Sequence, residues 1–347
     1  MSAEDAPDEV SDPVGYFLDD MTYHGKSERT RKSYERVLRE FESFLASRDE
    51  DGGVHLSETT HRDCLAWIHD RRGAVAPSTV ATYASYLHRF YDYMVQVGIF
   101  DSNPMALVVE EMDETIATDP DRRELSVPEM RSFVGGLSHP LDRAVVVTLL
   151  KTGMRAGELC NLDLRDVAVP SLGDLHDEPT RPQLNGRDGA IYVSPEPARN
   201  ATVNGERRTA SNKRKRPTVI PVDGELAGVL KRWLAIRPDP VSPAEPLFVS
   251  TADNWGRRLE PEQVHHLVTD HAADAGWYRP GSGAEENVTP HYFRHFFTTH
   301  LRDRTGDRGI VKYLRGDVAG DVIDTYTHDW GDRVRETYER HIYSLLP

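Results

Sequence analysis

Cysteine is scarce in this chain of 347 residues: there are two, Cys64 and Cys160, far apart and without the spacing of a metal site. Structural disulfides are therefore not expected, and a reducing cytoplasm is the expected location. Long apolar runs are also missing, because no stretch approaches the ~20 apolar residues that a membrane-spanning helix needs. The first ten residues, MSAEDAPDEV, are acidic and have no apolar run, so we expect no signal peptide and no membrane partner.

Basic residues are outnumbered, 42 against 57 acidic residues, which gives a net charge of −15. This balance argues at first against a nucleic-acid partner, and it is also typical of proteins from a salt-rich cytoplasm. The charge is uneven, however. Between Arg199 and Arg216 lie seven basic residues and one acid, Glu206. This segment, called the basic stripe below, can bind phosphate groups although the rest of the chain is acidic.

The first hundred residues have the apolar spacing of helices. Helices are predicted over residues 12–23, from Ser27 onward, over 60–71, and from Pro77 to Gly98. They predict a helical domain over residues 1–106. Residues 107–124 are acidic, lack a clean period and are broken by Pro120, so they are predicted to be a linker.

Residues 125–347 mix both kinds of element and are predicted to form a second domain. β-Branched residues and turn signals between Ala190 and Val222 predict a small antiparallel sheet that carries the basic stripe at a hairpin. The fold class is therefore mainly α with a small antiparallel β-sheet. The predicted helices span residues 127–137, 141–152, 155–161, 224–236, 261–275, 290–303, 310–314 and 333–345.

The stretch TPHYFRHFFTTHL, residues 289–301, separates into two faces on a helical wheel. His291, Arg294 and His295 lie on one arc, and the phenylalanines lie on the opposite arc, which predicts a buried face and an exposed one. A zinc site at His291 and His295 has suitable i,i+4 spacing, but an intervening glutamate and a third ligand are missing.

Three further segments carry reactive side chains. TGMRAGELCNL contains Arg155 and Glu158 on one helix face, Lys213 lies in the basic stripe, and YLRGDVAGDVIDTYTHDW contains Tyr326. Two arginines, a lysine, a histidine and a tyrosine, without a carboxylate cluster for Mg²⁺, suit phosphoryl transfer to tyrosine without a metal or another cofactor.

These segments resemble the tyrosine recombinase or phage integrase family, that is, Xer-like site-specific recombinases, and in particular haloarchaeal-type integrases. The resemblance covers nearly the whole chain, including ERTRKSYERVLREF, APSTVATYASYLHRFYDYM and Asn103–Pro104. It implies a four-helix, SAM-like core-binding domain followed by an α+β catalytic domain. It assigns catalytic roles to two arginines, a histidine, a lysine and a tyrosine: Arg155, Arg294, His291, Lys213 and Tyr326. It assigns supporting roles to the neighbouring acid, Glu158, and to the last histidine of the HYFRH box, His295. Lys215 competes with Lys213, and Tyr313, Tyr338 and Tyr343 are rivals of Tyr326.

One position departs from the family pattern. Asp317 stands where the family usually has histidine or tryptophan, and we include it among the catalytic candidates. An ionised carboxylate there would repel a phosphate. Three interpretations stay open: Asp317 turns away, toward Arg315 for example; it orients Tyr326 or His291; or the enzyme is slow.

The resemblance implies site-specific cleavage and rejoining of double-stranded DNA through a 3′-phosphotyrosyl intermediate. It also implies a homodimer or tetramer on DNA at the nucleoid, with accessory DNA-bending or directionality proteins. Alternatives are a catalytically impaired DNA-binding regulator and a DNA-relaxing enzyme like the type IB topoisomerases. The predicted DNA-contacting residues are Lys26, Arg29, Arg31, Lys32, Thr79, Arg89, Arg214, Lys215 and Arg216.

Overall fold

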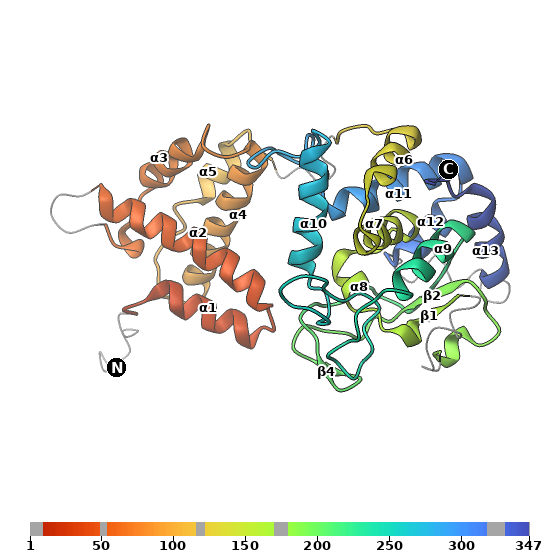
Figure 1. Ribbon diagram of the computed structural model, residues 1–347. Helices are drawn as coiled ribbons and strands as arrows, with labels where there is room; N and C mark the ends of the chain where they lie inside the picture. Colours follow the sequence, from red (N-terminus) through yellow and green to blue (C-terminus); the bar gives the residue numbers. More distant parts are fainter. Residues whose placement is uncertain (1–9, 49–53, 116–121, 170–179, 318–329, 347) are drawn as a thin grey trace. The chain divides into compact units, whose positions relative to one another are not determined.

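The computed structural model describes residues 10–48, 54–115, 122–169, 180–317 and 330–346, with the backbone alone at 330 and 331. The chain divides into two compact units, unit 1 (Met1–Pro120) and unit 2 (Asp121–Pro347). Both are rich in helix, and the strands form small antiparallel sheets, so the predicted fold class is confirmed (Figure 1).

Unit 1 is a small helical bundle. Ser27 begins one predicted helix by accepting a hydrogen bond from the N–H of Thr30 (3.1 Å), and Pro77 occupies the first turn of another, where its missing N–H is not needed. Edge-to-face aromatic contacts join Phe17 to Phe90 and Phe41 to Trp67 in the core. The helices are α1 (Pro13–Tyr23), α2 (Glu28–Ser47), α3 (His61–Arg71), α4 (Pro77–Gln96) and α5 (Ala106–Glu111), with a 3-10 turn at Leu56–Glu58.

Helix α5 differs from the sequence prediction, which placed residues 107–124 in a linker. Its Val108 is buried against the core of unit 1, and an ion pair between Arg72 and Glu114 ties the following residues to the end of α3. The first part of the predicted linker therefore belongs to unit 1. The sequence did not predict α5 because the helix is short and its segment is acidic, so it has too few apolar residues to show a helical period. The assignment of residues 1–106 and 125–347 as functional domains stays a prediction.

Unit 2 is organised around α7 (Pro140–Thr152), which is buried almost along its whole length. A helix that is apolar all round belongs in a core, and here α9 (Gly224–Leu234) and α11 (Pro290–Thr305) pack on it. The remaining helices are α6 (Val127–Gly136), α8 (Ala156–Cys160), α10 (Pro261–Asp274), α12 (Arg308–Arg315) and α13 (Trp330–His341), with 3-10 turns at Leu164–Asp166 and Pro182–Leu184.

Two separate sheets replace the single predicted one. β1 (Val167–Ala168), β2 (Ala190–Val193) and β5 (Thr218–Pro221) form an antiparallel sheet in the order β1-β2-β5. β3 (Thr202–Val203) and β4 (Glu206–Arg207) form a hairpin of their own. The basic stripe covers this hairpin and the loop that leads into β5, so Lys213 lies in that loop rather than at a hairpin tip.

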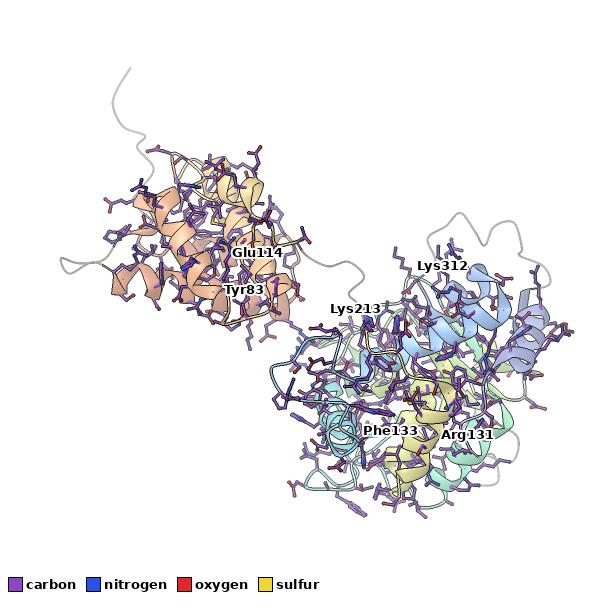
Figure 2. The ribbon with its side chains drawn as sticks, turned by 90° about the horizontal axis from the view of Figure 1, so that it is seen from above. Tyr83, Glu114, Arg131, Phe133, Lys213 and Lys312 are labelled. Carbon is purple, nitrogen blue, oxygen red and sulfur yellow. The ribbon has the colours of Figure 1, made fainter. Side chains whose placement is uncertain are left out.

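The C-terminal residues pack on their own unit. Helix α13 ends at His341, earlier than the predicted 345, and Leu345 is buried beyond the helix. Arg131 of α6 donates to the carbonyl of Ser344 (3.0 Å), and Phe133 of the same helix stacks on Trp277; Figure 2 labels both α6 residues. Among the described residues, no helix is long and apolar enough to cross a membrane.

Candidate active site

Helix α11 turns its aromatic residues into the core of unit 2. Phe293, Phe296 and Phe297 are buried, as the helical wheel predicted. Arg294 is buried as well, with 2% of its surface exposed, although the wheel placed it on the exposed arc beside His291. The difference arises because the end of α7 and the end of α12 cover this part of the helix.

The Arg294 guanidinium is held by hydrogen bonds on both of its terminal nitrogens. Nη1 donates to the backbone carbonyls of Gly153 (2.7 Å) and Arg315 (3.0 Å), and Nη2 donates to Oδ2 of Asp317 (2.7 Å). Burial and the nearby Arg155 lower the pKa of Arg294 to about 10, so the group stays charged at neutral pH.

Arg155 reaches the same carboxylate from the start of α8. Gly153 ends α7 in the left-handed conformation (φ 61°), and a side chain there would meet the Phe297 ring, so the turn that presents Arg155 requires glycine. Arg155 Nη2 donates to Oδ1 of Asp317 (2.7 Å). Arg155 and Arg294 therefore meet, as the motif predicts for two arginines that share a phosphate.

Glu158 fixes the position of Arg155. Its carboxylate is fully buried and accepts hydrogen bonds from the backbone N–H and Nη1 of Arg155, both at 3.0 Å. It also accepts one from Nη2 of Arg214 (3.2 Å). Burial opposes the charge of Arg155, but Glu158 and Asp317 outweigh this effect and raise its pKa.

Arg214 was predicted to contact DNA, which needs an exposed side chain, but the structure buries it. Its side chain is completely buried, with Nη2 on Glu158 and Nη1 on the carbonyl of Leu314 (3.0 Å). Its guanidinium therefore cannot reach a phosphate on the surface. A run of basic residues has the same sequence pattern whether its side chains point inward or outward, so the sequence did not predict the burial of Arg214.

Asp317 joins three arginines. In addition to Arg155 and Arg294, Arg315 places Nη2 2.9 Å from Oδ2. The first of the three interpretations was that Asp317 turns away from the site, for example toward Arg315. The contact with Arg315 is present, but the carboxylate also faces the predicted catalytic arginines and is not turned away from them. Burial opposes ionisation of Asp317, yet Arg294 and Arg315 outweigh it and hold the pKa of the carboxyl below its usual value.

His291 is exposed in the first turn of α11 and lines a cavity of about 290 Å³. Arg122, His265, Tyr278 and Asn287 are among the other lining residues. Partial loss of hydration in this setting, together with the positive charges of Arg122 and Arg294, lowers the pKa of His291. The imidazole is therefore neutral at neutral pH and can accept a proton.

Lys213, Lys215 and Arg216 are exposed, and Figure 2 labels Lys213 on the surface of unit 2. Within the described part of the chain, Lys213 has no ion-pair partner and no hydrogen bond to the arginine cluster. Its neighbour Arg214 does reach the cluster, so the loop passes beside the site while the lysine points outward.

Tyr326 lies outside the described residues, but its three rivals do not. Tyr338 and Tyr343 are completely buried, donate to the carbonyls of Lys151 and Leu150, and have pKa values raised well above the usual one by burial. Burial also raises the pKa of Tyr313, whose hydroxyl accepts a hydrogen bond from the N–H of Val219 (3.4 Å). These three hydroxyls are poor nucleophiles where they lie.

The predicted DNA-contacting residues of unit 1 lie mostly at its surface. Lys32 pairs with Glu28 on α2 (3.0 Å), and Arg89 pairs with Asp92 on α4 (3.5 Å). Exposed pairs of this kind are weak and can exchange a carboxylate for a phosphate. The remaining members are exposed or half-buried, on α2, on α4 or just before α2: Lys26, Arg29, Arg31 and Thr79.

His295 is half-buried and lies one turn from Thr299, whose hydroxyl is 3.5 Å from its Nε2. Among the described residues, no group of three or more His, Cys, Asp or Glu side chains is arranged to hold a metal ion, so the zinc interpretation of His291 and His295 finds no third ligand there.

Two contributions to the site were not predicted from the sequence. Arg315 was considered only as a possible partner of Asp317, and the buried position of Arg214, where it donates to Glu158, was not predicted. The sequence signal for Arg315 was its place two residues before Asp317, at the end of a predicted helix.

Comparison with known proteins gives the family. Residues 16–99 match the N-terminal SAM-like domain of phage integrases, and residues 196–331 match the Phage integrase family. The tyrosine recombinase XerC of Pelotomaculum thermopropionicum is 24% identical over 326 residues, which cover 90% of this chain and 92% of the relative. The tyrosine recombinase XerD of Shewanella oneidensis is 25% identical over 335 residues, covering 94% and 95%. The chain belongs to the phage integrase family of tyrosine recombinases.

Solved structures agree with this fold. The Tn1549 transposon integrase in complex with a circular intermediate DNA aligns with a TM-score of 0.63 at 18% identity, covering 94% of this chain and 99% of that one. A lambda integrase dimer bound to a COC′ core site aligns with a TM-score of 0.60 at 15% identity, covering 88% and 93%. This recombinase is thus an enzyme that cleaves and rejoins DNA. The match at 196–331 includes His291, Arg294 and Tyr326 but begins after Arg155, whose assignment rests on its motif and its contact with Asp317.

Proposed function

We propose that this recombinase exchanges strands of double-stranded DNA at specific sites, with Tyr326 as the nucleophile and a 3′-phosphotyrosyl intermediate. The observation that carries the proposal is the meeting of Arg155 and Arg294 at one carboxylate. Guanidinium groups bind carboxylate and phosphate oxygens with the same fork of N–H donors, so a site that holds one anion can hold the other.

The roles of the side chains follow from the charges that develop during cleavage. Attack on a phosphodiester increases the negative charge on the non-bridging oxygens, which Arg155 and Arg294 would stabilise. A neutral His291 would accept the proton of the attacking tyrosine or donate a hydrogen bond to the phosphate. Lys213 would protonate the departing 5′-oxygen. Because the DNA-free protein holds Lys213 outside the cluster, the loop before β5 would have to turn inward on the DNA.

Tyr326 is favoured over its rivals by elimination. A nucleophilic tyrosine must reach the phosphate and lose its proton, which its reference pKa of ~10 already makes difficult. Burial raises the pKa of Tyr313, Tyr338 and Tyr343 further, and each hydroxyl is engaged with the backbone of its own unit. Tyr326 also keeps the YTH context of the family motif.

We further propose that the protein acts as a dimer or tetramer on duplex DNA, in the cytoplasm and at the nucleoid. The support is the likeness in fold to a lambda integrase dimer on a core site and to a lambda integrase tetramer bound to a Holliday junction, the latter with a TM-score of 0.61 at 15% identity. Accessory DNA-bending or directionality proteins would decide which exchange is favoured.

The test begins with the DNA segments that the purified protein protects in genomic DNA. A nicked suicide substrate built on such a segment should trap a covalent protein–DNA adduct, visible as a band of reduced mobility after denaturation. Tyr326→Phe should abolish the adduct, because phenylalanine lacks the attacking oxygen, and Tyr313→Phe should retain it.

Two results would contradict the proposal. Tight binding without any adduct from the wild-type protein would indicate a DNA-binding regulator. Relaxation of plasmids that lack the protected segment would indicate an enzyme of the topoisomerase type.

A further inference from the structure

The three arginines around Asp317 form a preassembled site for an anion. The Nη2 atoms of Arg155 and Arg294 lie 2.7 Å from Oδ1 and Oδ2 of the carboxylate, and the Nη2 atom of Arg315 lies 2.9 Å from Oδ2. The Nη1 atom of Arg155 is occupied by Glu158, and the Nη1 atom of Arg294 by two carbonyls. The Nη2 atoms of these two groups therefore converge on one place, which Asp317 occupies.

Resting on the function proposed above, we propose that Arg155, Arg294 and Arg315 form one oxyanion site, and that Asp317 fills it in the DNA-free protein. Cleavage then requires the scissile phosphate to replace this carboxylate. Arg315 thereby becomes a third phosphate-binding arginine, and Asp317 becomes an internal competitor of the substrate. No bond is made or broken in the exchange; one anion leaves the three guanidinium groups and another enters.

The backbone allows the exchange without unfolding. Helix α12 ends at Arg315, Gly316 adopts the left-handed conformation (φ 71°), and the N–H of Asp317 donates to the carbonyl of Lys312 (3.2 Å). These bonds fix the Cα of Asp317, while its side chain is 27% exposed. Rotation of that side chain can therefore carry the carboxylate into water while the main chain stays in place.

Exchange is favoured over joint occupancy by charge. Asp317 is ionised at neutral pH, since its pKa lies below the usual value. A phosphodiester placed beside it would meet a like charge at contact distance, and the Nη2 atoms that the phosphate would need already contact the carboxylate. Without any anion, the same arginines would face one another with unpaired donors, which destabilises the site. Asp317 therefore stabilises the free protein and opposes substrate binding.

Asp317→Asn separates these two effects because it keeps the size of the side chain and removes its charge. We expect a lower melting temperature than that of the wild-type protein in buffer without phosphate or sulfate. Inorganic phosphate should then raise the melting temperature of the variant and bind about tenfold or more tightly than to the wild-type protein. Asp303→Asn is the matched control, since it removes an exposed carboxylate of α11 that pairs with Arg302. Its phosphate affinity should equal that of the wild-type protein.

Arg315→Gln in the Asp317→Asn background tests the third arginine. The gained phosphate affinity should fall by about tenfold, because one of three donors is lost. Equal phosphate affinity in Asp317→Asn and the wild-type protein would overturn the proposal, and Asp317→Ala supplies the same comparison if the asparagine variant does not fold.

DNA cleavage gives an independent readout. With the nicked suicide substrate below saturation, Asp317→Asn should form the adduct faster than the wild-type protein. A slower or unchanged rate would overturn the proposal, since Asp317 would then be a catalytic group or would never meet the phosphate. Failure of the wild-type protein to form any adduct would instead contradict the proposed function, and the phosphate titration does not depend on that activity.

Discussion

The Glu158 carboxylate accepts hydrogen bonds from the backbone of Arg155, the side chain of Arg155 and the side chain of Arg214. Both Glu158 and Arg214 have fully buried side chains. A buried ion pair has a small net effect when it is intact, but removing one partner leaves the other charge without compensation. The orientation of Arg155 toward the anion site therefore depends on Glu158, whose carboxylate is fully buried.

Glu158→Gln should lower the free energy of unfolding by about 3–5 kcal/mol, because Arg214 would remain buried without its counter-ion. Urea denaturation followed by circular dichroism measures this loss. Glu262→Gln, an exposed residue at the start of α10, is the control and should change the stability little. A stability for Glu158→Gln equal to that of the control would show that Glu158 does not hold the two arginines.

For single residues, the sequence predicted which residues belong to the site better than it predicted the partners that their side chains contact. Arg155, Arg294 and Glu158 came from short motifs, and the structure brings them together. The inward turn of Arg214 could not be predicted, because its partners Glu158 and Leu314 lie far from it in the chain. Tertiary partners of a charged residue leave no local pattern in the sequence.

Among the elements, helix α12 ends just before Gly316, where both the backbone conformation and the packing of Arg214 require glycine. The residue has φ 71°, which favours glycine, and a Cβ there would lie 2.6 Å from Cγ of Arg214. Gly306 ends α11 with a similar φ of 66°, but a Cβ there would have nothing within 4 Å. The two glycines thus share a backbone requirement and differ in packing.

Gly316→Ala should therefore destabilise the protein more than Gly306→Ala. The second variant should cost about 1 kcal/mol from the left-handed backbone alone, and the first should add the cost of displacing Arg214. Thermal unfolding of both variants measures the difference. Gly316→Ala should also slow adduct formation, because a displaced Arg214 would disturb Glu158 and through it the position of Arg155, whereas Gly306→Ala should leave the rate unchanged. Equal melting temperatures would argue against the close packing of Arg214 on this turn.

Helix positions were well predicted where local chemistry determines them. Ser27, Pro77 and Ser126 begin helices at or beside the predicted residues. Helix ends were less accurate, as at α13, because the chain continues to bury apolar residues such as Leu345 after the helix stops. Apolar spacing alone does not separate a last helical turn from a packed extended tail.

Over the whole molecule, each unit has its own hydrophobic core. The buried cluster of unit 1 runs from Val14 to Val108, and that of unit 2 from Leu125 to Leu345. The net charge of −15 is a property of the whole chain, whereas DNA would meet only local groups of exposed basic side chains. The basic stripe is smaller than its sequence suggests, since Arg208 and Arg214 are buried in ion pairs with Asp163 and Glu158.

The reduced stripe leads to a prediction for the salt dependence of DNA binding. Lys215 and Arg216 are exposed and remain candidate phosphate contacts. Replacing both by alanine should reduce the slope of log affinity against log salt by about 1.8, because each lost phosphate contact removes ~0.9. Fluorescence anisotropy on a duplex carrying the protected segment, measured across a range of salt concentrations, gives the slope. The control is Lys231→Ala with Arg232→Ala, two basic residues of α9 outside the stripe, and it should leave the slope unchanged. Equal slopes for the wild-type protein and the stripe variant would exclude Lys215 and Arg216 from the DNA contact.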